Sequence, residues 1–103
     1  MPPVAAATES ALRREDGALV FSGALDRAAA AALWPQASSA LSGVQRIVLT
    51  KVTTVDSAGL ALLAELAARL RATGTSVRIE GEPSGLAELR TAYRLAPDLD
   101  YPA

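Results

Sequence analysis

A short apolar run, Ile47-Val48-Leu49, precedes a long segment, residues 57–73, in which leucines recur at helical spacing. Three consecutive apolar residues, two of them β-branched, are typical of a strand that is covered on both faces. A helix that follows such a strand usually leads to a parallel neighbour through a right-handed crossover. Together these two features restrict the chain to an α/β fold with parallel strand pairs.

An antiparallel hairpin is predicted before this unit. Residues 11–15 and 18–22 flank Asp16-Gly17, a dipeptide that favours the type I′ turn because both central residues of that turn need positive φ. Gly23 would end the second strand. The inward side chains of the hairpin would be Leu12, Leu19 and Phe21.

An alanine-rich helix is expected between the hairpin and the apolar run. Asp26 would be its N-cap, and the helix should extend towards Leu41 before Ser42-Gly43 closes it. Pro35 lies inside this segment and lacks an N–H group. It predicts a kink, or a break with a second helical segment that starts near Pro35.

The second half of the chain continues the alternation. Residues 50–55 are mostly polar, so we expect a loop from the strand to the long helix, which Asp56 or Ser57 would cap and Gly74 would end. A strand is expected at 76–80 and a last helix from 83 to about 95. The predicted fold is a four-stranded mixed sheet, an N-terminal antiparallel hairpin followed by parallel βαβ crossovers, packed with about three helices.

The length and the ends of the chain favour one domain in the cytoplasm. Residues 1–10 are rich in proline and alanine and unpatterned, which indicates a flexible tail, and residues 11–103 would form the domain. No apolar run approaches the ~20 residues of a membrane-spanning helix, and the N-terminus lacks the positive charge of a secretory signal. We therefore expect no direct membrane insertion.

The composition argues against several classes of function. The chain contains no histidine and no cysteine, so it lacks the commonest general base, the commonest metal ligand and any thiolate nucleophile. Its 10 basic and 11 acidic residues give a net charge of −1, without the basic cluster of a nucleic-acid-binding protein. We expect no catalytic residue, no metal site, no cofactor and no nucleic-acid partner.

The long helix has two contrasting sides when its residues are placed about 100° apart. The predicted core side holds Gly59, Leu60, Leu63, Leu66, Ala67 and Leu70, with Leu62 at its edge. The opposite side holds Ser57, Ala58, Ala61, Glu65, Ala68 and Ala72. Its small side chains would let a partner approach closely, which predicts a docking surface, whereas the 23 alanines of the chain offer a purely compositional explanation.

Ser57 admits three roles at the start of this helix. Its hydroxyl could cap the helix, accept a phosphate near the helix N-terminus, or contact a partner directly. Asp56 competes for the capping role, which would leave Ser57 for the other two. Catalysis by Ser57 would need a base, and a pairing with Lys51, the only lysine, is disfavoured because no pocket or oxyanion group is indicated.

Residues 52–60 read VTTVDSAGL and are followed by Leu62-Leu63. This pattern resembles the signature of STAS domains, a family of anti-sigma factor antagonists and transporter-associated regulators. The resemblance covers residues 12 to 95 and implies the STAS fold. Leu33-Trp34 and the stretch from Leu89 to Tyr93-Arg94-Leu95 are similar to the STAS subunits of phospholipid-transport ABC complexes of the Mla type.

The resemblance implies a non-enzymatic subunit, peripheral to the inner membrane, in the system that maintains outer-membrane lipid asymmetry. Its partner would be the ATPase (MlaF-like), and through it a permease (MlaE-like) and an MlaD-like component. Ser57 would correspond to the family's conserved Ser/Thr, which lies at the interface in the transporter subunits and is phosphorylated in the anti-sigma factor antagonists. Val48 stands where the family often has an acidic residue or Asn, which argues against phosphorylation chemistry.

The leading hypothesis is therefore a binding module that docks on an ABC ATPase. The partner-binding residues would be Ser57, Ala58, Ala61, Glu65 and Ala68, while Asp56 and Gly59 shape the helix start. The alternative is an anti-sigma factor antagonist that is switched by phosphorylation of Ser57. A free-standing lipid carrier is a third possibility, disfavoured because so small a chain leaves little room for a cavity beside its core.

Overall fold

Strands and helices alternate along the chain in the predicted order. The computed structural model describes residues 10–96 and 99, so most of the expected tail, residues 1–10, lies outside the described residues. The elements are β1 (Ala11–Glu15), β2 (Ala18–Leu25), α2 (Arg27–Ser39), β3 (Arg46–Val55), α3 (Ser57–Ala72), β4 (Arg78–Glu80) and α4 (Leu86–Ala92).

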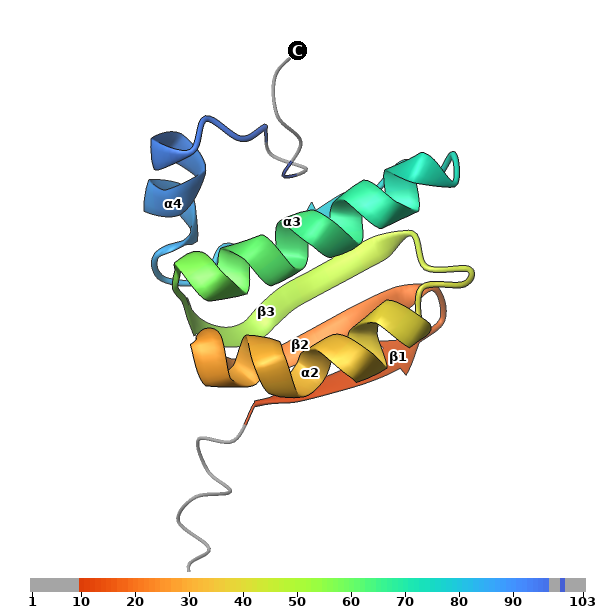
Figure 1. The fold of residues 1–103 in the computed structure, drawn as a ribbon, viewed down its shortest axis with the longest axis horizontal. Coiled ribbons are helices and arrows are strands. Elements are labelled where there is room, and N and C mark those ends of the chain that lie inside the picture. The colour runs from red at the N-terminus through yellow and green to blue at the C-terminus, as the bar shows by residue number, and fades with distance from the viewer. Residues whose placement is uncertain (1–9, 97–98, 100–103) are drawn as a thin grey trace, which may run out of the picture.

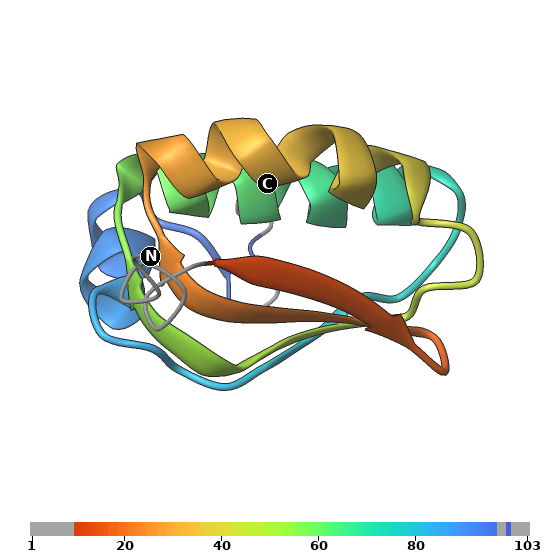
Figure 2. The ribbon, with the colours of Figure 1, turned by 90° about the horizontal axis from the view of Figure 1, so that it is seen from below.

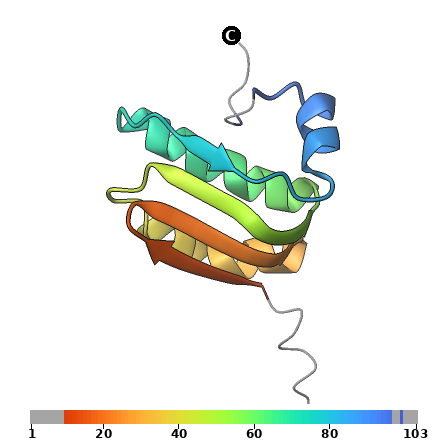
Figure 3. The ribbon, with the colours of Figure 1, turned by 180° about the vertical axis from the view of Figure 1, so that it is seen from behind.

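The four strands form one mixed sheet in the order β1-β2-β3-β4 (Figure 3). β1 is antiparallel to β2, and the β2–β3 and β3–β4 pairs are parallel. Each parallel pair is joined by one helix, α2 and α3 respectively (Figure 1). The predicted α/β class and the mixed sheet are therefore confirmed.

Both α2 and α3 lie on the same face of the sheet, and α4 lies at one end (Figure 2). The two crossovers move in the same direction across the sheet, so a common right-handed sense places both helices on one side. The expectation that β3 is covered on both faces is wrong. Ile47 and Leu49 are buried under the helices, whereas Val48 between them is only half-buried on the open face.

The hairpin forms as predicted and continues further. Asp16 and Gly17 have φ values of +43° and +81°, as a type I′ turn requires. Leu12, Leu19 and Phe21 are buried. β2 does not end at Gly23 but runs to Leu25.

α2 begins at its predicted cap, where Asp26 Oδ1 accepts the N–H of Ala29 at 2.9 Å. Of the kink or break predicted at Pro35, the break is wrong, because the helix is continuous to Ser39. Pro35 lies on the exposed side, and the carbonyl that loses its donor belongs to Ala31, which is also an exposed residue.

β3 is ten residues long, so the expected loop at 50–55 is instead the second half of a strand. Its parallel pairing with β2 continues through Gly23–Val52 and Leu25–Val55, after shifts in register. These shifts turn Val52 and Val55 into the core despite the polar residues between them.

The C-terminal elements are shorter than predicted. β4 covers only the second part of the expected strand, and α4 starts at Leu86 and ends at Ala92. Ser84 forms a parallel bridge with Thr54, and Gly85 has a φ of +92°, so the chain is not yet helical at these positions.

The core lies between the sheet and the two helices. Phe21, Leu25 and Ile47 are fully buried on the sheet side. The predicted core side of α3 is confirmed, since these seven residues are all buried: Gly59, Leu60, Leu62, Leu63, Leu66, Ala67 and Leu70.

Candidate docking surface

The start of α3 separates the two polar residues of the motif. Asp56 is the N-cap, because its Oδ1 accepts the N–H of Gly59 at 2.9 Å. Ser57 is the first residue of the helix, and it is exposed. Its hydroxyl has no hydrogen-bond partner among the described residues, so Asp56 performs the capping and leaves that hydroxyl for another contact.

Gly59 holds α3 close to the sheet. A Cβ at this position would lie 2.1 Å from the carbonyl oxygen of Leu25 at the end of β2. Only glycine permits this approach of helix to strand. Asp56 and Gly59 thus shape the helix start, as predicted, while Ser57 faces outwards.

The outer side of α3 presents small side chains to solvent. Ser57, Ala61, Glu65 and Ala68 are exposed, and Ala58 is half-buried. We call these five residues the α3 face. The structure thus places all five predicted partner-binding residues on one accessible side of one helix, and their use in binding stays a prediction.

Beyond Ala61, the outer side of α3 carries the paired side chains of Glu65 and Arg69. Arg69 Nε donates to Glu65 Oε2 at 3.1 Å, and its guanidinium lies 4.9 Å from the ring centroid of Trp34 on α2. This cation–π contact ties the two helices together on the outside of the helical layer. Arg69 and Trp34 belong to the surroundings of the α3 face, although the sequence did not point to this pairing.

A small pocket opens beside Ser57. Its volume is about 170 Å³, and it is lined by Ser57, Leu60, Ala61, Ala64, Tyr93 and Leu95. The first four residues belong to α3, and the last two belong to the end of α4 and the segment after it. Tyr93 keeps 49% of its surface exposed, and no other large hydrophobic residue in the described part of the chain is exposed.

Comparison with known proteins places this arrangement in a family. The family model described as "Mlab, STAS domain" matches residues 9–99. The chain belongs to the STAS-domain family. It is 33% identical over 81 residues to the intermembrane phospholipid transport system binding protein MlaB of Escherichia coli K12, which is 79% of this chain and 84% of that protein. MlaB of Shigella flexneri matches with the same figures.

Solved structures confirm the fold of this STAS domain. The unphosphorylated anti-sigma factor antagonist SpoIIAA has a TM-score of 0.61 at 20% identity, over 86% of this chain and 84% of that chain. An anti-sigma factor antagonist from Mycobacterium paratuberculosis has a TM-score of 0.58 at 24% identity, over 92% and 86% of the two chains. At these identities the likeness concerns the fold alone.

Sequence reasoning did not assign Tyr93 and Leu95 to the site. They served there only as points of family resemblance, because their place depends on where the chain returns after α4. The one available signal is chemical: Tyr93 is one of only four aromatic residues, and it lies near the end of the last predicted helix.

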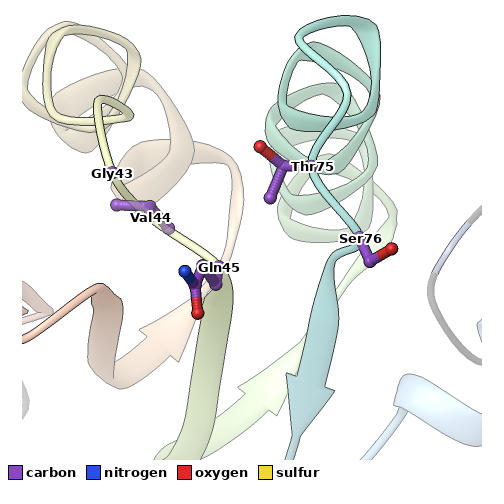
Figure 4. A pocket seen from close by; sticks show the side chains of 5 residues that line it. All are labelled: Gly43, Val44, Gln45, Thr75 and Ser76. Atoms are coloured by element: carbon purple, nitrogen blue, oxygen red, sulfur yellow. The ribbon is translucent and has the colours of Figure 1, made fainter.

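A larger hollow lies at the opposite end of the STAS domain. It has a volume of about 380 Å³ and is lined by Gly43, Val44, Gln45, Thr75 and Ser76 (Figure 4). Figure 4 shows that these residues come from two turns, one before β3 and one after α3, and that the Ser76 hydroxyl points away from the other turn. Polar backbone, amide and hydroxyl groups share this lining with apolar atoms, so it suits a lipid acyl chain less well than a fully apolar cavity would.

Three further features of the described residues concern other kinds of site. Among residues 10–96 and 99, no group of three or more potential metal-binding side chains gathers at one place. Lys51 is exposed within β3, where it is paired in register with Ser22, and it is not in a loop as predicted. No helix in the described part is long and apolar enough to cross a bilayer.

Proposed function

We propose that this STAS domain is a regulatory and assembly subunit of a phospholipid-transport ABC complex of the Mla type. The observation that carries the proposal is the 33% identity to MlaB, a phospholipid transport system binding protein, over 79% of the chain. In this role the protein is cytoplasmic and catalyses no reaction. It is held at the inner membrane through an MlaF-like ATPase, and through that subunit it is linked to an MlaE-like permease and an MlaD-like component that maintain lipid asymmetry.

The α3 face is the surface proposed to dock on the ATPase. Alanine side chains allow the backbone of a partner helix or loop to approach closely, and their methyl groups lose no hydrogen bonds when they are buried. The buried leucines on the other side of α3 hold the helix rigidly against the sheet. The Glu65–Arg69 ion pair would form a polar rim, which is common around a smaller apolar contact.

Bulky charged substitutions on the α3 face test this proposal. Ala61→Arg and Ala68→Arg place a long cation on exposed positions, so the core should stay intact while the partner is held away. We expect each variant to lose co-purification with the ATPase subunit. Circular dichroism and thermal unfolding would establish that the fold is retained.

Ala32→Arg is the matched control, because Ala32 is also an exposed alanine inside a helix. It lies one turn before Gln36, whose side chain donates to the carbonyl of Leu12 on β1. Ala32 therefore lies on the side of α2 that is turned towards β1 and away from α3. Normal co-purification of both Ala61→Arg and Ala68→Arg with the ATPase would contradict the proposal.

The exposed hydroxyl of Ser57 favours one alternative, an anti-sigma factor antagonist regulated by phosphorylation. Asp56 already caps the helix, so Ser57 is accessible to a kinase at a helix N-terminus that attracts an anion. This alternative predicts that Ser57 carries a phosphoryl group in the cell. Intact-mass measurement of the protein from its native cells, grown under several conditions, distinguishes the two functions: a stoichiometric phosphoryl adduct on Ser57 supports the antagonist.

A further inference from the structure

The chain reverses after α4 through a turn that contains a non-glycine residue with positive φ. The N–H of Arg94 donates to the carbonyl of Thr91 at 3.2 Å, and the N–H of Leu95 donates to the carbonyl of Arg90 at 2.9 Å. This is the hydrogen-bond pattern of a Schellman motif, in which the residue at the position of Arg94 is left-handed and is usually glycine. Arg94 adopts a φ of +56°, so an arginine occupies a conformation that glycine adopts with less strain.

The same turn builds one wall of the pocket beside Ser57. Tyr93 and Leu95, the two neighbours of Arg94, both line it opposite Leu60, Ala61 and Ala64 of α3. The volume of about 170 Å³ is below the range of about 300–1,000 Å³ that is typical of small-molecule sites. A single side chain of a partner fits this space better than a lipid or a cofactor does.

Arg94 also supplies an unpaired charge next to this wall. It is exposed and forms no ion pair with the described residues, whereas the neighbouring Arg90 is paired with Glu82 at 3.3 Å. The carboxylate of Asp56, at the start of α3, is engaged in capping that helix, because it accepts the N–H of Gly59. The pocket is therefore lined mostly by apolar side chains, and Arg94, which is not itself a lining residue, lies in the sequence between two residues that line it.

We propose that this pocket anchors the partner subunit by taking one apolar side chain, and that Arg94 binds a carboxylate beside that side chain. The proposal rests on the proposed function and names the chemistry of the ATPase segment that docks there: an apolar residue adjacent to Asp or Glu. The small volume favours a single side chain over a lipid as the occupant, and the unpaired Arg94 favours a protein segment that carries an acidic group beside that side chain. Tyr93 acts as the large, half-exposed anchor residue that is typical of interface centres.

Substitution of Arg94 separates binding from folding. Arg94→Gly relieves the left-handed strain, so the temperature of unfolding should rise by about 4 °C or more. The same variant should bind the purified ATPase subunit at least about 5-fold more weakly, because the contact of the guanidinium with a carboxylate is lost. Arg94→Glu should weaken binding further, and the salt dependence of the affinity should be smaller for Arg94→Gly than for the wild type.

Tyr93→Ala removes the pocket wall and should weaken binding by at least about 10-fold. Thr91→Ala is the control, because Thr91 lies on α4 next to Ala87, Glu88 and Ala92, in a hollow that shares no residue with the pocket beside Ser57. Thr91→Ala should bind as the wild type does.

Wild-type affinity in both Tyr93→Ala and Arg94→Gly overturns the inference. If Ala61→Arg nevertheless abolishes binding in the same assay, the proposed function stands without this anchor; if Ala61→Arg and Ala68→Arg also bind normally, both proposals fail.

The absence of cysteine from the chain allows the occupant to be identified directly. Arg94→Cys creates a unique attachment point for a photoactivatable thiol reagent, and Thr91→Cys is its control. Mass spectrometry of the cross-linked complex should join residue 94 to an ATPase peptide in which an apolar residue adjoins an acidic one. A cross-link from residue 94 to a second copy of this chain, or to a co-purified lipid, would overturn the proposal.

Discussion

Asp56 and Ser57 are adjacent and can both accept a hydrogen bond, yet the structure gives them different tasks. The carboxylate of Asp56 satisfies the N–H of Gly59, one of the N–H groups that a helix start leaves without a partner. The hydroxyl of Ser57 is exposed on the first turn. The stability of α3 and the chemistry of its surface therefore depend on different residues.

This division predicts unequal effects of two alanine substitutions. Asp56→Ala should lower the free energy of unfolding by about 1 kcal/mol, because the capping bond is lost. Ser57→Ala should change it by less than about 0.5 kcal/mol, as is usual for an exposed residue without partners. Urea denaturation of both variants checks this. An equal loss in both would show that Ser57 shares the capping role.

Gly59 and Gly74 offer a second comparison at single residues. Gly59→Ala forces a Cβ to within 2.1 Å of the Leu25 carbonyl oxygen, so α3 must move away from β2. A cost of about 3 kcal/mol is expected, at the upper end of overpacked cores. At Gly74 an added Cβ meets no atom within 4 Å, and only the φ of +88° disfavours alanine. Gly74→Ala should therefore lower the free energy of unfolding by about 1 kcal/mol. Denaturation curves that rank the two variants in the opposite order would contradict this account of the helix–strand contact.

Local features of these residues explain which parts of the site could be predicted. A cap, a turn glycine and an outward-facing alanine are determined by neighbours within about four positions, so Asp56, Gly74 and Ala61 were identified from the sequence. Tyr93 was not assigned to the site because its position depends on the path of the chain after α4. Long-range contacts of this kind leave no periodic signal in the sequence.

At the scale of elements, α3 was predicted closely and β3 was not. The leucines of α3 repeat at helical spacing, and burial follows that repeat along the whole helix. In β3, shifts in register with β2 disturb the alternation of inward and outward residues, so residues 50–55 looked like a loop. Val52 and Val55 were the two apolar residues of this segment that still indicated a strand.

α2 shows how context can override a helix-breaking residue. Pro35 lies in the middle of a continuous helix on its exposed side, where the loss of one hydrogen bond is tolerated. Pro35→Ala restores the N–H group and removes the ring, while it also increases the freedom of the unfolded chain. The net gain in unfolding free energy should be about 1 kcal/mol, with higher helix content by circular dichroism. A loss of stability would show that the ring itself packs usefully.

At the scale of the whole molecule, the proposed docking surface lies on the helical side of a sheet that has helices on one face. α2 and α3 cover one face, and no helix of residues 10–96 lies on the opposite face of the sheet (Figure 2). The α3 face and the pocket beside Ser57 share Ser57 and Ala61, so they form one continuous surface that joins the start of α3 to the end of α4. A partner that covers Ser57 and also fills the pocket would contact Tyr93 as well.

A negative charge at Ser57 should consequently act on assembly and not on folding. Ser57→Glu places a carboxylate at the positive end of α3, which leaves the fold unchanged or slightly more stable. The same charge would be desolvated against the partner at the edge of an apolar pocket, so the affinity for the ATPase should fall by at least about 10-fold, whereas Ser57→Ala should stay within about 3-fold of the wild type. Thermal unfolding and a binding titration on both variants separate the two effects. If Ser57→Glu binds the ATPase normally, Ser57 lies outside the contact, and the docking surface must be moved along α3 towards Ala68.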